Sequence, residues 1–414
     1  MKKLTIFLLV MLSAACTSFE RSPYGDAVRH LAVTVTYPEG YEHYLRAGVA
    51  VTLSDRNSGN VYTAQTDARG AAEFRVAAGH YKLSVLDLPD DEAVFNGAVE
   101  LVDLSGGDQQ MSVALSFSKP GTIIIKEIYS GGCPQDPPST GSYTYDKYVI
   151  LHNNSFETQY LDGLCFGMVA PYNSSAQNNP WTSTDASGNL VFREFAAVPD
   201  CIWQFPGTGE DFPLAPGEDA VIAYHGVDHT ATYSQSVNLN RKGYFVLYDL
   251  LLYPGTKTYP TPAPGDQIDE AHYMKVLKKT GKSGETGANT YVISNNSPAV
   301  IIFRAPEGFD LTAYLATKDS EAQNGSLIYS KVPWEWIIDG AEVADNTGAV
   351  RTKRLRTDVD AGAVGFSAMA QGHTLHRRLN EASTESAGFE IYYDTNNSSN
   401  DFYERETQSL RESL

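Results

Sequence analysis

Short stretches in which polar and apolar residues alternate, separated by turn residues, constrain the fold of this 414-residue chain most strongly. Residues 31–36 and 48–53 alternate in this way, and Asn57, Gly59 and Asn60 mark a hairpin turn after the second stretch. Alternation with a period of two is typical of β-strands that bury one face. Many short strands at this spacing favour a β-sandwich, so we predict an all-β chain.

The first series of strands contains two turn motifs, formed by Thr66, Asp67, Gly70, Phe74, Gly79 and Tyr81. The pattern over residues 30–118 resembles the carboxypeptidase-regulatory or transthyretin-like β-sandwich. This resemblance implies a non-catalytic spacer or attachment module, so it predicts a geometry rather than an activity.

A second series of strands begins after the turn residues at 118–121, which break the pattern and suggest a domain boundary. Its strands are expected at 122–129, 146–154, 160–167, 214–223, 243–248, 299–303 and 389–393. The order of the first four resembles the lamin-tail immunoglobulin-like domain. That resemblance implies a second, larger sandwich with long inserts over residues 119–414. The sequence predicts one helix in it, at 310–317, with Asp310 as its N-terminal cap.

The N-terminus has the order of a cleavable export signal. Two lysines precede an apolar run at 4–12, and three small residues lead directly into Cys16. The segment resembles a bacterial lipoprotein signal, which implies that residues 1–15 are removed and that Cys16 carries the acyl chains. Residues 16–29 would then be a tether. The alternative is an ordinary cysteine in a secreted chain.

The charge and the remaining apolar runs restrict the partners of the chain. Its net charge is −19, and such an acidic chain repels phosphate backbones, so we expect no nucleic-acid partner. No second apolar run approaches the roughly 20 residues of a spanning helix. We therefore expect contact with the membrane through the lipid anchor alone.

Three cysteines follow Cys16, an odd set for an oxidising compartment, so at most one internal disulfide can form. Our preferred pair is Cys133 with Cys201. A bridge between Cys165 and Cys201 is nearly as well supported.

Two segments have the residue types of metal sites. Oxygen ligands recur at alternate positions near the C-terminus and suggest calcium, at Asp394, Asn396, Ser398, Asn400 and the adjacent Asp401. The segment lacks the glycine and the glutamate of an EF-hand, and the alternative is an Asx-rich turn that bonds its own backbone.

A second segment places two imidazoles and a carboxylate within residues 225–229, which can suit a transition metal if the loop curls around it. The alternative is a solvent loop. Of the two metals calcium is preferred, and the sequence suggests no further cofactor.

Aromatic residues provide the candidate binding surface. Trp334 and Trp336 flank a glutamate, and Tyr143 and Tyr145 lie in one loop. Exposed rings of this kind stack on sugars or anchor a protein partner. The alternative is that the two tryptophans pack inward. A basic cluster at 351–356 could hold a phosphate, or could be a solvated loop.

Taken together, these features resemble uncharacterised lipoproteins of Bacteroidetes, which implies a place in the cell envelope, with the outer membrane preferred and its side left open. The predicted role is non-catalytic binding of an outer-membrane receptor, an envelope partner or a captured nutrient such as a glycan. The alternatives are a surface enzyme acting on glycan or peptide, for which we find no catalytic motif, and an adhesive or structural surface protein.

Overall fold

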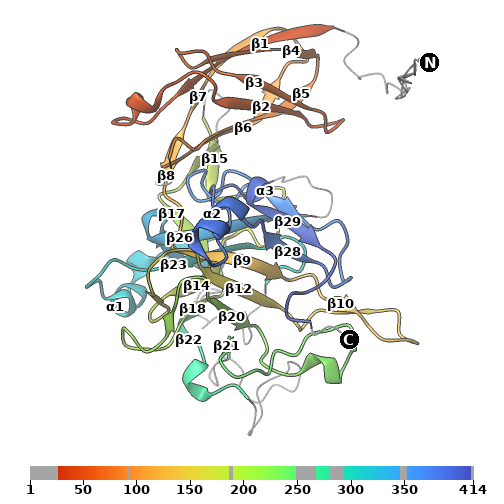
Figure 1. Ribbon diagram of the computed structural model, residues 1–414, viewed down its shortest axis with the longest axis vertical. Coiled ribbons are helices and arrows are strands. Elements are labelled where there is room, and N and C mark those ends of the chain that lie inside the picture. Colours follow the sequence, from red (N-terminus) through yellow and green to blue (C-terminus); the bar gives the residue numbers. More distant parts are fainter. Residues whose placement is uncertain are drawn as a thin grey trace, which may run out of the picture.

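The structure is a computed structural model that describes residues 27–90, 93–185, 190–248, 267–279, 293–345 and 352–411. Nearly every regular element in these residues is a β-strand, so the all-β prediction is confirmed. Figure 1 shows two bodies stacked along the long axis of the molecule, a smaller one built from the start of the chain and a larger one built from the rest. We call them the N-terminal sandwich and the larger domain.

The N-terminal sandwich consists of two sheets. One has the order β4 (Ala71–Ala77), β1 (Val28–Thr36) and β7 (Gln109–Ala114). The other has the order β3 (Val61–Gln65), β2 (Ala50–Asp55), β5 (His80–Asp87), β6 (Val94–Asp103) and β8 (Ser116–Ser118). The inward residues of the alternating strands, among them Leu31, Val51 and Phe95, form one buried core. Burying these apolar faces is the main stabilising term of the sandwich.

The turn before β4 shows why the turn motif has glycine at position 70. Asp67 accepts hydrogen bonds from the backbone of Arg69 and Ala71 at 2.8 and 2.9 Å, which closes the turn. Gly70 has a φ of +79°, and a Cβ there would lie 2.7 Å from the carbonyl oxygen of Val35. Only glycine fits this position without strain.

Two six-stranded sheets form the larger domain. The first has the order β21 (Phe245–Val246), β20 (Asp219–Ala223), β12 (Tyr148–Asn153), β9 (Ile123–Tyr129), β28 (Thr374–Arg377) and β29 (Phe402–Arg405). The second has the order β22 (Lys275–Lys279), β18 (Cys201–Gln204), β14 (Cys165–Met168), β23 (Ala299–Phe303), β26 (Ile337–Ala344) and β27 (Val364–Gly365). Val149 and Leu151 of the first sheet share one buried cluster with Val300 and Ile302 of the second. The two sheets therefore pack face to face.

Further small sheets cover this pair. A three-stranded sheet has the order β17 (Phe195–Val198), β25 (Leu327–Pro333) and β24 (Glu321–Asn324). The two-stranded pairs are β10 (Cys133–Pro134) with β11 (Ser142–Tyr143), β13 (Gln159–Tyr160) with β19 (Pro213–Leu214), and β15 (Thr182–Thr184) with β16 (Leu190–Phe192). The outer face of β23 packs against this layer, since Ile301 and Phe303 cluster with Val332.

The helices are short. The predicted one is α1 (Leu311–Leu315), where the Asp310 side chain accepts from the backbone of Ala313 and Leu311 and Leu315 are buried. Two others, α2 (Glu381–Ala387) and α3 (Ser398–Asp401), were not predicted. Single 3-10 turns complete the elements: η1 (Glu42–Tyr44), η2 (His229–Ala231), η3 (Glu270–His272), η4 (Lys318–Ser320) and η5 (Trp334–Trp336).

The predicted strand at 389–393 is wrong. In the described part of the chain this segment forms one isolated bridge, between Leu379 and Tyr392. Its backbone is held instead by a side chain, because Asn154 accepts from the Tyr392 amide at 2.8 Å and donates to its carbonyl at 3.0 Å.

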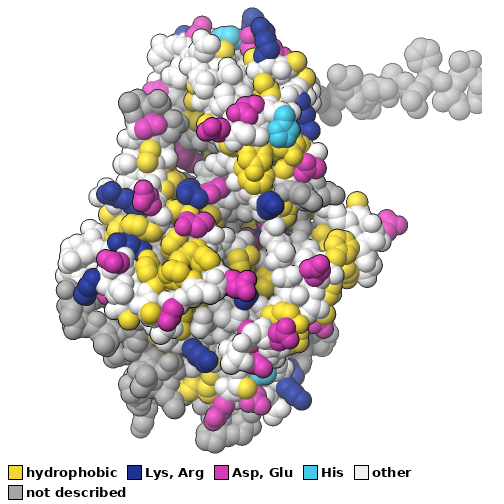
Figure 2. Space-filling model, turned by 90° about the vertical axis from the view of Figure 1, so that its left-hand side faces the viewer, with side chains coloured by type: hydrophobic (Ala, Val, Ile, Leu, Met, Phe, Trp, Pro, Cys, Tyr) yellow, Lys and Arg dark blue, Asp and Glu magenta, His cyan; other side chains and the backbone are white. Residues whose placement is uncertain are grey.

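Figure 2 shows one long side of the molecule, with the N-terminal sandwich above the larger domain. Hydrophobic side chains gather over the upper part of the larger domain on this side, and acidic and basic side chains are interspersed around them. The excess of negative charge is therefore not concentrated in one patch on this side. None of the helices in the described part of the chain has the length and apolar character needed to span a bilayer.

Candidate functional site

Four strand ends meet at one end of the larger domain. In the first sheet, the start of β12 pairs with the end of β20, as Tyr148 opposes Ala223. In the second sheet, the end of β14 pairs with the start of β23, as Met168 opposes Val300. The loops that precede or follow these four strands therefore converge at the same end of the sandwich.

These loops enclose a cavity of about 380 Å³, which we call the loop-end cavity. This volume is within the range of about 300–1,000 Å³ typical of small-molecule sites. The lining residues are Thr144, Tyr145, Lys147, Tyr172, Asn173, Tyr224, His225, Ile293, Asn295 and Asn296. Aromatic rings and side-chain amides make up most of this lining, and its one formally charged side chain is a lysine.

Lys147 is the most perturbed charged group of the cavity. Its side chain is 8% exposed, and among the described residues its ammonium donates one hydrogen bond, to the carbonyl of Ile293 at 3.3 Å. Burial lowers the Lys147 pKa to about 8, although the neighbouring Asp146 acts in the opposite direction. The carboxylate of Asp146 accepts hydrogen bonds from Tyr129 and Ser236, at 2.8 and 2.6 Å. Strongly perturbed groups in a cavity are typical of functional sites.

His225 and His229 do not form the metal pair considered above. Each ring is tied to the protein: His225 donates through Nδ1 to the carbonyl of Tyr145 at 2.9 Å, and His229 contacts the Tyr143 hydroxyl at 2.7 Å and the His225 carbonyl at 3.0 Å. Burial lowers the His225 pKa to about 3, so this ring is neutral at physiological pH. His225 therefore lines the loop-end cavity, and His229 contacts its backbone from behind.

Of the four aromatic residues predicted to bind ligands, Tyr145 alone lies in the loop-end cavity. Its ring is half-buried and stands edge-on to the His225 ring, with centroids 5.7 Å apart. Tyr143 is 8% exposed, and its hydroxyl is used by His229. It contributes to the wall behind the cavity.

The prediction that the two tryptophans form a binding surface is wrong. Trp334 and Trp336 are 4% and 8% exposed and lie in η5 rather than on a strand. The Trp334 indole nitrogen donates to the carbonyl of Arg193 at 2.7 Å, and both rings belong to a buried cluster. Their apolar area is already used in packing, so neither is available to stack on a ligand.

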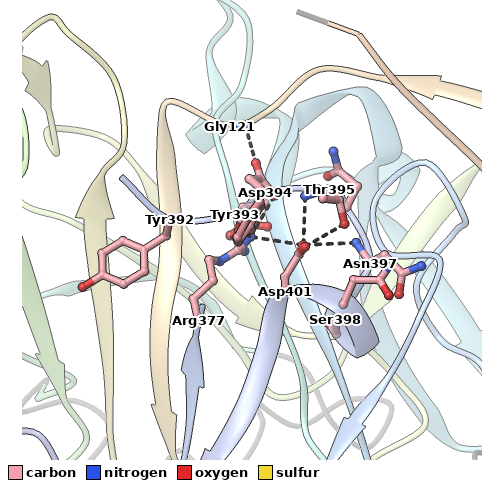
Figure 3. A network of polar contacts seen from close by, with 12 residues as sticks. Gly121, Arg377, Tyr392, Tyr393, Asp394, Thr395, Asn397, Ser398 and Asp401 are labelled. Carbon is pink, nitrogen blue, oxygen red and sulfur yellow. Dashed lines mark hydrogen bonds and ion pairs between the residues drawn. The ribbon is translucent and has the colours of Figure 1, made fainter. Parts of the chain in front are cut away.

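Two of the predicted calcium ligands, Asp394 and Asp401, contact an arginine instead (Figure 3). The guanidinium of Arg377 donates to Asp394 at 2.8 Å, to Asp401 at 3.4 Å and to Asp339 of β26 at 2.6 Å. Burial, together with the nearby charge of Asp394, raises the pKa of Asp339 and Asp401, and Arg377 opposes that rise. A fixed cation of the protein thus occupies the place expected for a metal ion.

The rest of this segment bonds to the protein as an Asx-rich turn. Asp401 accepts from the amides of Thr395 and Asn397, at 3.0 and 3.3 Å, and from the Thr395 hydroxyl at 2.6 Å. Ser398 donates to Asp360, and Asn400 is exposed. No group of three or more His, Cys, Asp or Glu side chains that could hold a metal ion occurs among the residues described, and the calcium interpretation is replaced by the turn.

This turn also joins the two bodies. Asp394 accepts from the Gly121 amide, and Asn396 donates to Ser118 at 3.1 Å. From the N-terminal sandwich, Asn96 donates to the carbonyl of Thr395 at 2.7 Å. The same residues that suggested calcium therefore hold the linker between the two bodies.

The cysteine prediction is also corrected. Cys133, Cys165 and Cys201 are buried free thiols, so the expected bridge between Cys133 and Cys201 does not form. Cys133 lies beside Asp146, whereas Cys201 lies in the core between the two large sheets. Burial raises the pKa of the Cys133 and Cys165 thiols to about 12, so both are protonated at neutral pH. The predicted lipidation site, Cys16, lies outside the described residues.

Two other cavities are less suited to a ligand. The larger, of about 450 Å³, lies between the linker and the larger domain, where Arg356 and Asp358 pair across its wall. The other, of about 340 Å³, is lined by Asp219, which is already bonded to Lys126 and His152 at 2.7 and 2.6 Å. Their polar groups are engaged in holding the fold.

The sequence did not single out Lys147, Tyr172 or the asparagines of the loop-end cavity. Asn295 and Asn296 lie shortly before the expected strand at 299–303. The available signal was position, because each of these residues lies at or within five residues of the end of an expected strand.

Comparison with known proteins finds similarity to a family whose function is unknown. Residues 215–409 match the family model described as "Protein of unknown function (DUF4876)". No curated protein matches the chain. A solved structure of a DUF4876 family protein from Bacteroides thetaiotaomicron VPI-5482 is similar, with a TM-score of 0.56 and 24% identity over 91% of this chain and 94% of that one.

A second solved structure, the Bacillus anthracis TIE protein, aligns with a TM-score of 0.19 and 12% identity over 46% of this chain and 32% of that one. A score this low carries no argument about fold. The B. thetaiotaomicron structure therefore supports the fold over most of the chain, and residues 215–409 are similar to the DUF4876 family model.

Proposed function

We propose that this chain is a lipid-anchored, non-catalytic binding protein of the bacterial cell envelope that captures a ligand in the loop-end cavity. The observation that carries the proposal is the position of this cavity, at the end of the larger domain opposite the linker.

Strand register supports that position. The chain enters β9 directly from the linker at Gly121, and in the first sheet Ile123 opposes Asn153 whereas Tyr129 opposes Tyr148. The cavity begins beside Tyr148, at the other end of the same pair of strands. Six residues at about 3.3 Å each separate the two ends by roughly 20 Å.

This arrangement suits a protein held by its N-terminus. The N-terminal sandwich would act as the spacer, and the lipid on Cys16 as the anchor, so that the loop-end cavity faces away from the membrane. A captured glycan is the ligand class that we favour, because tyrosine rings and side-chain amides are well suited to sugar rings and hydroxyls. Delivery to an outer-membrane receptor is the corresponding partner proposal.

The test is a glycan array probed with the full chain in detergent, as wild type and as two matched variants. Asn296→Trp adds bulk at an exposed position of the cavity, and Asn324→Trp adds the same bulk at an exposed position of the β24–β25 hairpin. We expect the wild type and Asn324→Trp to bind the same glycans and Asn296→Trp to lose them. Binding that survives in Asn296→Trp, or no binding by the wild type, would contradict the proposal.

A further inference from the structure

The charge of the loop-end cavity restricts the ligand further. Lys147 provides the formal charge of the lining, and that charge is positive in a chain whose net charge is −19. An ammonium has three donors, and the described contacts of Lys147 use one of them, at 3.3 Å. Its burial therefore has a desolvation cost that the protein offsets only in part.

An anionic oxygen in the cavity would offset this cost by pairing with the ammonium and accepting its other hydrogen bonds. A single lysine balances one negative charge, which matches a carboxylate better than a doubly charged phosphate. At pH 7 the lysine is still mostly protonated, since its pKa is about 8.

The rest of the lining is neutral and of mixed polarity. Tyr145 and Tyr172 are partly exposed and offer ring surface at the cavity, and Asn295 and Asn296 add amide donors and acceptors from the loop before β23. Side chains of these types match the carbon face and the hydroxyls of a sugar ring. His225 adds a neutral imidazole, because burial lowers its pKa to about 3.

We infer that the loop-end cavity binds an acidic sugar, whose carboxylate pairs with Lys147 while its ring and hydroxyls lie against the tyrosines and asparagines. This inference rests on the proposed function and names the ligand class of the same site.

The experiment is calorimetric titration of the full chain in detergent with two matched pairs of sugars. D-glucuronate is compared with D-glucose, and D-galacturonate with D-galactose, because each pair differs in a carboxylate against a hydroxymethyl group. We expect at least one acid to have an affinity at least about tenfold higher than that of its neutral partner, which is typical of a buried charge pair.

The variant Lys147→Met should remove this preference, so that the acid and its neutral partner bind with equal affinity. Lys318→Met is the matched control, because the Lys318 side chain is 86% exposed on η4, away from the cavity. It should behave as the wild type. Should Lys147→Met fail to fold, Asn296→Trp tests the same site, and it should weaken both members of each pair.

Equal affinity for acid and neutral sugar would overturn the acidic-sugar inference and leave the proposed function standing. Tighter binding of glucose 6-phosphate than of glucuronate would also overturn it. No measurable binding of either acid would overturn it as well, and the glycan array then decides the proposed function separately.

Discussion

Replacing Lys147 by methionine should stabilise the protein, although it removes the residue that we expect to bind the ligand. The side chain is 8% exposed, and burial lowers its pKa from 10.5 to about 8. Each pKa unit between these values corresponds to about 1.4 kcal/mol, so holding the buried ammonium costs the folded state about 3 kcal/mol at neutral pH. Methionine has a similar length and no charge.

The substitution also removes the hydrogen bond to the Ile293 carbonyl, worth about 1 kcal/mol. The expected net gain in the free energy of unfolding is therefore about 2 kcal/mol at pH 7. Binding sites commonly lower the stability of the free protein, because a group that bonds to the ligand lacks part of its hydrogen bonds when the ligand is absent.

The stability difference between the variant and the wild type should also depend on pH. The folded-state pKa of Lys147 is lowered, so between pH 8 and 10.5 the unfolded chain binds more protons at this site than the folded chain. Wild-type stability at this site therefore rises with pH in that window, whereas the methionine variant has no group to titrate. The advantage of the variant should be complete below pH 8 and should vanish as the pH approaches 10.5.

Urea unfolding followed by tryptophan fluorescence is the assay. All four tryptophans, at positions 181, 203, 334 and 336, lie in the larger domain, so the signal reports the unfolding of that domain. Lys353→Met is the matched control. Lys353 is also 8% exposed, but it pairs with Glu342 at 3.5 Å and donates to the Gly362 carbonyl at 2.6 Å. Its loss should destabilise the domain by about 3 kcal/mol.

A Lys147→Met variant that is less stable than the wild type at pH 7 would refute this reasoning. So would a stability difference that does not change between pH 7 and pH 10, because the calculation depends on the titration of this one group.

Three further predictions concern the corrected sites and the anchor. Arg377→Met should lower the free energy of unfolding by about 3–5 kcal/mol in urea titrations, since it leaves buried aspartates without their cation. In the wild type, a chelator should leave the melting temperature unchanged; a lower melting temperature would support the calcium site after all. Thiol titration of the unfolded protein without reductant should find Cys133, Cys165 and Cys201 all reactive, and a missing pair would indicate a disulfide. Cys16→Ser should move the chain from the membrane fraction to the soluble fraction, and unchanged fractionation would argue against lipidation at that residue.

The strands could be predicted where polar and apolar residues alternate or where an apolar run is continuous. Residues 299–303 were expected as a strand and form β23 with those same bounds. Residues 389–393 contain four apolar residues in five, but they form one isolated bridge in place of a strand, and sequence alone does not reveal that outcome. Helix α2 was missed because it buries no residue, so it has no apolar period; Asn380 and Gly388, its caps, were the available signal.

Contacts between distant segments could not be predicted. The carboxylates at 394 and 401 have the spacing of cation ligands, and a cation does lie among them, but it is the guanidinium of Arg377. The basic cluster at 351–356 looked like a solvated loop, yet Arg354 is 1% exposed and pairs with Glu342 at 2.7 Å. Local composition predicts that these charged side chains will find an opposite charge, but it does not identify the residue that provides it.

Hydrogen–deuterium exchange with and without a glycan retained on the array tests the central claim most directly, because it locates the bound ligand on the whole chain. The account predicts slower exchange in the described loops at 143–147, 172–174 and 293–297 and no change in the N-terminal sandwich. Protection confined to the N-terminal sandwich or to the linker at 118–121 would contradict it.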